Sequence, residues 1–230
     1  MFVELLDQLR CPAPHEETWL VLFADESRDR HILRGTLGCP VCHMKYPIVD
    51  GTVWFTAIDR ATHEGVVRAL VSVPPAAVPL PPTALAAYLD LGEPGGAVAL
   101  FGSWAGYAEE LGDIIERVEL VAIAPDGPTH PMQSAIMPPS RAQVPLAPGA
   151  LRAAAVDAAP DAAPDAAPDA AIVVIEAARI VRSGGRILAP ASAPVPAGVR
   201  ELTRDDTWWI GEREGGTTSG MIPLGRSRSR

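Results

Sequence analysis

Three cysteines and a histidine near the start of the chain have the residue types and spacing of metal ligands. Cys11 is followed four residues later by His15, and after a further 23 residues the chain reads Cys39-Pro40-Val41-Cys42. Two such knuckles, each turning the chain back on itself, can place four soft or borderline ligands tetrahedrally around zinc. The pattern therefore predicts a zinc site formed by Cys11, His15, Cys39 and Cys42.

The first knuckle is the weaker half of this pattern. Pro14 stands where a second cysteine is expected, and the longer side chain of His15 must absorb the shift of one residue. His31 and His43 are alternative ligands, and the plainer interpretation is that the cysteines are reduced structural thiols. A closed four-ligand site leaves no position for water, so the zinc would be structural and not catalytic. Its binding would contribute on the order of 10 kcal/mol to folding so small a unit.

Charge and hydropathy exclude several function classes. The 230 residues include 28 acidic and 19 basic side chains, and the net charge of −9 argues against nucleic-acid binding. No uncharged apolar run is long enough for a transmembrane helix, although this leaves room for peripheral contact with a membrane complex. The first residues include two acids where a signal peptide needs basic residues, so we expect a cytoplasmic protein. In a reducing compartment, three cysteines favour metal ligation over disulfides.

Composition divides the chain into four zones. The first holds all three cysteines, the second is helical and rich in proline, the third alternates apolar runs with helical patterns, and the last is a flexible basic tail. A repeat of Ala-Ala-Pro-Asp interrupts the third zone and predicts a surface loop, because a proline recurs at every turn. The predicted boundaries are 1–57, 58–95, 96–214 with the loop at 157–170, and 215–230.

The third zone predicts an α/β fold with a mostly parallel sheet. Short apolar runs alternate with helical stretches at a spacing typical of strand–helix–strand crossovers. The turn Ser183-Gly184-Gly185 is expected to separate a helix from the strand that follows it. The expected strands are 97–101, 118–123, 150–156, 186–189 and 207–210, and the expected helix is 172–181.

Residues 1–57 resemble the small zinc-ribbon proteins that activate tRNA and protein methyltransferases. The resemblance lies in the leucines that lead into Cys11-Pro12, in Cys39-Pro40-Val41-Cys42, and in Tyr46-Pro47-Ile48-Val49-Asp50-Gly51. It departs from that family at Pro14 and His15. In the family, this module lends a β-strand and an apolar surface to a methyltransferase. The resemblance therefore implies an interaction role, and the module could dock on the rest of its own chain.

The larger zone resembles class I S-adenosylmethionine-dependent methyltransferases. The similarity lies in Pro145-Leu146-Ala147-Pro148-Gly149 and in the segment from Ala178 to Arg186. The family's first strand ends in an acid and a glycine-rich turn, because the backbone must approach the cofactor closely. Here Leu100 occupies the position of the acid, and Trp104 occupies the position of the central glycine, between Gly102 and Gly106. Ala124 replaces the acid that binds the ribose, with Asp126 two residues late.

These departures predict a degenerate cofactor motif, although Trp104 could instead be an ordinary core residue. We therefore expect a pseudo-methyltransferase with no catalytic residues and no S-adenosylmethionine, acting as a binding or scaffolding subunit with a protein partner or larger complex. The alternative is an S-adenosylmethionine-dependent methyltransferase with an atypical cofactor pocket. Other chemistry is not indicated, because His63 and His130 are isolated and Asp205-Asp206 reads as a solvated turn.

Overall fold

The computed structural model describes residues 1–56, 80–125, 129, 133–157 and 170–215. Most of the predicted connector, most of the Ala-Pro-Asp loop and nearly all of the basic tail lie outside the described residues, as do His63, Asp126 and His130. Among the described helices, none is both long enough and apolar enough to cross a membrane.

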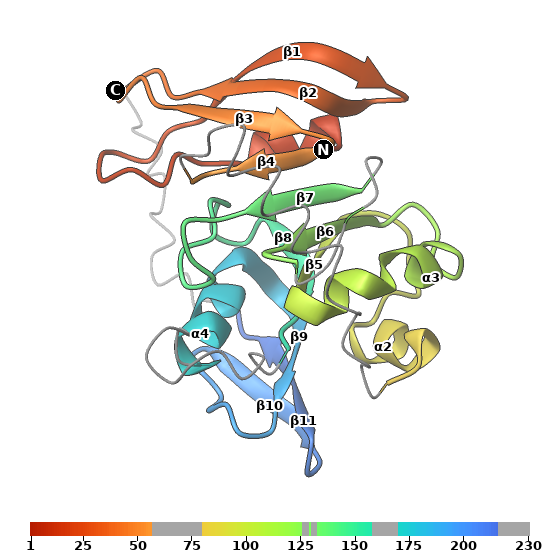
Figure 1. The fold of residues 1–230 in the computed structure, drawn as a ribbon. Coiled ribbons are helices and arrows are strands. Elements are labelled where there is room, and N and C mark those ends of the chain that lie inside the picture. Colours follow the sequence, from red (N-terminus) through yellow and green to blue (C-terminus); the bar gives the residue numbers. More distant parts are fainter. Residues whose placement is uncertain (57–79, 126–128, 130–132, 158–169, 216–230) are drawn as a thin grey trace, which may run out of the picture.

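A single mixed sheet of eleven strands runs through the described part of the chain (Figure 1). Its strand order is β1-β2-β3-β4-β7-β6-β5-β8-β9-β11-β10. The strands are β1 (Val21–Arg28), β2 (His31–Gly38), β3 (Lys45–Val49), β4 (Thr52–Trp54), β5 (Ala97–Phe101), β6 (Glu119–Ile123), β7 (Ser134–Met137), β8 (Leu151–Ala155), β9 (Val181–Pro190), β10 (Val199–Arg204) and β11 (Trp208–Arg213).

The first four strands form an antiparallel meander that joins the rest of the sheet through β4. Strand β4 pairs in parallel with β7, with Thr52 opposite Ala135 and Trp54 opposite Met137. A 3-10 helix, η1 (Val3–Gln8), precedes the first four strands in the chain. The N-terminal residues therefore extend the sheet of the remaining chain by pairing main chain with main chain.

Strands β4, β7, β6, β5, β8 and β9 run parallel, as the predicted crossovers require. From β5 the chain adds β6 and then β7 on one side, and it afterwards places β8 on the other side of β5. The order thus reverses between β5 and β8. In open α/β sheets, ligands bind outside the carboxyl ends of the strands at such a switch point.

The predicted turn at Ser183-Gly184-Gly185 is wrong, because these residues lie inside β9. The pairing with β8 shifts register between Leu151 and Ala153, so the strand accommodates an irregularity there without ending. Gly184 adopts φ +75°, a conformation that glycine tolerates inside such a bulge. The two glycines therefore mark an irregularity within one long strand and do not form a turn between a helix and a strand.

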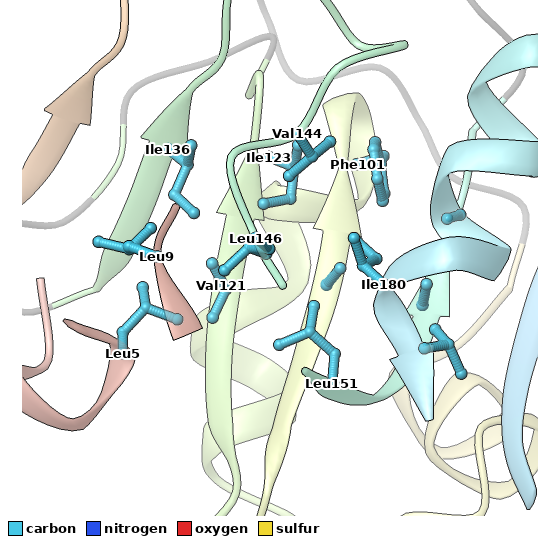
Figure 2. Packing of buried hydrophobic residues seen from close by; sticks show 14 of the residues in the cluster. Leu5, Leu9, Phe101, Val121, Ile123, Ile136, Val144, Leu146, Leu151 and Ile180 are labelled. Atoms are coloured by element: carbon cyan, nitrogen blue, oxygen red, sulfur yellow. The ribbon is translucent and has the colours of Figure 1, made fainter. Parts of the chain in front are cut away.

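Helices cover both faces of the sheet (Figure 1). On one face, α2 (Pro82–Tyr88), η2 (Gly102–Tyr107) and α3 (Ala108–Gly112) bury a core that includes Leu85, Trp104 and Leu111. On the other face, α4 (Ala170–Ile180) and η1 share a larger core with the strands. Figure 2 shows Leu5 and Leu9 of the N-terminal segment beside Val121, Ile136 and Leu146.

The segment that leads into Cys11 is also fastened to the loop after β7. The main-chain N–H of Arg10 donates to the carbonyl of Pro145 over 3.0 Å, and that of Ala147 donates to the carbonyl of Gln8 over 2.8 Å. Leu9, which is fully buried, forms an isolated bridge with Leu146. The N-terminal residues and the parallel strands therefore share one core and one hydrogen-bonded sheet.

Candidate metal centre and switch-point site

The structure brings together the four side chains that the sequence proposes as metal ligands. The ligand atoms of Cys11, His15, Cys39 and Cys42 all lie within 4.8 Å of one another. The Cys11 and Cys42 sulfurs are 3.7 Å apart, and His15 Nε2 lies 3.2 Å from the sulfur of Cys11 and 3.4 Å from that of Cys39. Bond lengths of about 2.3 Å to sulfur and 2.0 Å to nitrogen in a tetrahedron give edges of roughly 3.5–3.8 Å. The three distances above are close to these edges, whereas the outer limit of 4.8 Å is wider, so the cluster approximates the size of a zinc site.

Neighbouring groups orient two members of the cluster. His15 Nδ1 lies 2.6 Å from the carbonyl oxygen of Glu16, and when Nδ1–H donates there, Nε2 keeps its lone pair toward the sulfurs. The Tyr46 hydroxyl lies 3.2 Å from the Cys11 sulfur and can donate to its thiolate. Tyr46 belongs to the motif that follows the second knuckle.

Local hydrogen bonding also distinguishes the thiols. Burial raises the pKa of the Cys11 thiol to about 11, despite the hydrogen bond with Tyr46. Burial raises the pKa of Cys39 as well, but backbone hydrogen bonds from Cys42 and Val41 oppose it, and the pKa is lowered to about 7. Zinc binds thiolates, so a metal ion here would displace the Cys11 proton.

The two spare histidines are not in this group of four. The His31 ring packs against Phe2, with ring centroids 5.2 Å apart, and its Nδ1 faces the carbonyl of Asp29. His43 forms the turn of the second knuckle, with φ +61° and a main-chain hydrogen bond to Cys39. The structure therefore places His15, and neither alternative, beside the three cysteines.

A second polar cluster lies at the switch point, between the carboxyl ends of β5 and β8. Asp157, two residues after β8, is 4% exposed. Its Oδ2 accepts hydrogen bonds from the Ser103 main-chain N–H at 2.9 Å and from the Ser103 hydroxyl at 3.1 Å. Arg141 completes the cluster, with Nη1 2.9 Å from Oδ1 and Nη2 3.2 Å from Oδ2. Only the contact with Oδ2 is a hydrogen bond; the contact of Nη1 with Oδ1 is an ion pair, and within the described part of the chain the buried Oδ1 has no hydrogen-bond donor.

Gly102 is required by this cluster. Its φ is +57°, and a Cβ built there would lie 1.7 Å from Arg141 Nη2 and 2.1 Å from Asp157 Oδ2. No other residue leaves room for the pair against the turn. The glycine motif predicts that a cofactor approaches the backbone closely. Here two side chains of this chain, Arg141 and Asp157, approach the backbone at Gly102 instead.

Trp104 is a core residue in this structure. The indole is fully buried in the core beneath α2 and α3, with its centroid 5.2 Å from that of Trp208 and 5.7 Å from that of Tyr107. Ala105 beside it packs against Ala122 and Ala135 of the sheet. The indole is therefore a core residue, and the prediction that it fills the cofactor site stays a prediction.

No carboxylate stands at Leu100, within β5, or at Ala124, directly after β6. Leu100 is fully buried in the same core as Trp104. Ala124 follows β6 with φ +45° and carries no carboxylate. The acid at the switch point comes instead from Asp157, which the sequence analysis placed in the Ala-Pro-Asp loop. Its position directly after the apolar run 150–156 was the signal that could have found it.

Asp205 has a structural role, as predicted for a turn. Its Oδ1 accepts hydrogen bonds from the main-chain N–H groups of Thr207 and Trp208, each at 2.7 Å. These hydrogen bonds lower the pKa of the Asp205 carboxyl. Glu201 and Arg204 pair nearby on the edge strand β10. This group is a surface turn and carries no site.

Comparison with known proteins identifies methyltransferase structures. No protein family matches the chain, and no curated protein matches it. A solved complex of the Haloferax volcanii Trm112 methyltransferase activator with its methyltransferase matches at 14% identity and TM-score 0.40, covering 59% of this chain and 90% of that one. The antibiotic-resistance methyltransferase Kmr matches at 15% identity and TM-score 0.39, covering 61% and 96%.

A structure from Methanococcus maripaludis, described as an S-adenosyl-L-methionine-dependent methyltransferase, matches at 10% identity and TM-score 0.41, covering 71% of this chain and 97% of that one. These matches contradict the expectation that the chain is not an enzyme, because the matched structures are methyltransferases. The expectation that S-adenosylmethionine is absent loses its support as well.

Proposed function

We propose that the chain is an S-adenosylmethionine-dependent methyltransferase with an atypical cofactor pocket, carrying a zinc-ribbon activator module in cis. The observation that carries this proposal is the sheet. Its parallel strands reverse order between β5 and β8, and a charged cluster lies at their carboxyl ends where such folds bind ligands. The methyl donor supplies an electrophilic methyl group when it is bound.

The donors at the switch point fit one part of that cofactor. Its amino-acid group carries a carboxylate, which needs hydrogen-bond donors and a positive charge. The Ser103 N–H, the Ser103 hydroxyl and the Arg141 guanidinium already converge on a carboxylate, that of Asp157. These groups would hold the cofactor's carboxylate. Ala124 supplies no acid for the ribose, which is the atypical feature of the pocket.

Parallel pairing of β4 with β7 supports the cis activator. The N-terminal module contributes a strand to the sheet and the apolar side chains of Leu5 and Leu9 to its core (Figure 2). That is the contact which the resemblance to methyltransferase activators implies, made within one chain. The Cys/His cluster would hold zinc at the base of the module, through Cys11, His15, Cys39 and Cys42. A separate activator protein is not needed in this proposal.

The test is calorimetric titration of the full-length, zinc-loaded protein with S-adenosylmethionine and with S-adenosylhomocysteine. The proposal expects saturable binding of one ligand per chain. Metal analysis of the same undenatured sample should give one zinc per chain. Absence of ligand binding in a sample that holds zinc would overturn the methyltransferase assignment, and absence of zinc in folded protein would overturn the metal site.

A further inference from the structure

The carboxylate of Asp157 occupies the very donors that a ligand's carboxylate would need. Asp157 Oδ2 accepts hydrogen bonds from the Ser103 N–H and hydroxyl, and both carboxylate oxygens face the Arg141 guanidinium. The side chains of Asp157 and Arg141 are 3% and 13% exposed, so this pair is withdrawn from water. The turn after β5 therefore already contains a bound anion, and that anion belongs to the protein.

Space at the turn leads to the same conclusion. A Cβ at Gly102 would overlap Arg141 Nη2 and Asp157 Oδ2, which shows how closely both groups approach the main chain. No second carboxylate can reach the Ser103 N–H while Asp157 remains there. An incoming carboxylate must replace that of Asp157 on the same donors.

We propose that Asp157 is an internal competitor, a latch that closes the anion site formed by Ser103 and Arg141 until a ligand's carboxylate displaces it. This inference rests on the proposed function and concerns the regulation of that same site. The ligand class is a nucleoside thioether or sulfonium that carries a free α-carboxylate. A ligand without the carboxylate does not bind these donors, so displacing Asp157 does not increase its affinity.

The latch makes a quantitative prediction about affinity. The apparent dissociation constant equals the intrinsic constant divided by the fraction of open protein. Removing the Asp157 carboxylate leaves the site open, so ligands that carry a carboxylate bind more tightly. If the open state holds about a tenth of the molecules or fewer, the gain is about tenfold or more.

The experiment compares two probes by calorimetry on the full-length protein. S-Adenosylhomocysteine carries the amino-acid group, whereas 5′-methylthioadenosine shares the adenosine and lacks it. We expect Asp157→Ala to tighten S-adenosylhomocysteine at least about tenfold while leaving 5′-methylthioadenosine unchanged. Asp157→Asn, which keeps the size and removes the charge, should give a smaller gain. Arg141→Gln should abolish the preference for S-adenosylhomocysteine.

Glu201→Gln is the matched control, because Glu201 also pairs with an arginine, Arg204, at 2.7 Å, and both lie on the edge strand β10. It should leave the ratio of the two affinities unchanged. If the wild type binds S-adenosylhomocysteine and Asp157→Ala binds it equally or more weakly, the latch is overturned and the proposed function stands. If no variant that retains a cooperative melting transition binds either probe, the proposed function falls, and the latch falls with it.

Discussion

The carboxylate of Asp157, at the end of the fourth parallel strand of the α/β region, accepts a hydrogen bond from the main-chain nitrogen of Ser103 over 2.9 Å. Ser103 is the second residue of η2, the 3-10 helix that follows the first of these strands, and lies 54 residues earlier in the chain. This contact joins the two strands between which the sheet reverses its order. The Ser103 N–H is therefore the main-chain donor that binds either Asp157 or, in the proposed function, the carboxylate of the cofactor.

Gly102→Ala should disrupt this contact. The new Cβ would fall on the Arg141–Asp157 pair, and φ of +57° is strained for alanine. We expect a loss of about 3 kcal/mol or more in the free energy of unfolding, from strain and from breaking a buried ion pair. Urea denaturation measures it.

Gly184→Ala provides the control for strain alone, because φ there is +75° and a Cβ meets nothing within 4 Å. It should cost only about 1 kcal/mol. Equal losses at the two glycines would show that the contact with the ion pair contributes nothing.

Trp104→Ala should lower stability and leave ligand binding intact. The indole is fully buried against Trp208 and Tyr107, so truncation creates a cavity and costs about 3–5 kcal/mol. Thermal melting measures the loss, and titration with S-adenosylhomocysteine at a temperature where the variant is folded measures binding. Tighter binding in this variant would mean that the indole does obstruct the pocket, as the sequence suggested.

Leu9→Ala should destabilise the whole chain and not the N-terminal residues alone. Leu9 is fully buried in the shared core and bridges Leu146. We expect a loss of about 2–5 kcal/mol in one cooperative transition. Leu6→Ala, at a half-buried neighbour, should cost less. Separate transitions for the cysteine-containing module and for the remaining strands would contradict the common core.

Zinc affinity should rise with pH. Burial raises the pKa of the Cys11 thiol to about 11, so this thiol is protonated at neutral pH and must lose its proton to bind zinc. For each proton released, the apparent affinity should increase about tenfold per pH unit below that pKa. Competition with a chromophoric chelator between pH 6 and 8 measures it, with Cys11→Ser as the control. A pH-independent affinity, after correction for the chelator, would contradict a thiol ligand at Cys11.

Glu119→Gln should stabilise the protein more at high pH than at low pH. Burial raises the pKa of Glu119, against a hydrogen bond from Ser134 and the nearby charge of His31. A raised folded-state pKa gives stability that is present below the unfolded value of 4.5 and lost as pH rises through the folded value. Glutamine has no charge to bury, so its advantage grows over that window. An advantage that shrinks with rising pH would contradict the direction of this shift.

The local sequence pattern predicted the strands and helices whose formation depends mainly on neighbouring residues. The apolar run Ala97–Phe101 is strand β5, and the helix predicted at 172–181 is α4, at Ala170–Ile180. The four metal-ligand candidates were predicted together because cysteine knuckles have a fixed spacing. Sequence could not reveal the pairing of Asp157 with Arg141 and Ser103, because it depends on how distant strands are ordered in the sheet.

The same limit applies to Trp104. Alignment to a glycine motif concerned its position in the sequence alone, whereas the structure shows that the 3-10 helix η2 places the indole in a core with Trp208 and Tyr107. Strands β1, β2 and β10 were missed because charged and polar residues interrupt their apolar alternation. Their pairing with neighbouring strands outweighs that weak local signal.

Titration of the full-length, zinc-loaded wild-type chain and its Asp157→Ala variant with S-adenosylhomocysteine tests the central claim most directly. The account predicts saturable binding of one ligand per chain, tighter by about tenfold or more in the variant. No binding by either folded protein would contradict the assignment of this switch point to an S-adenosylmethionine-type cofactor.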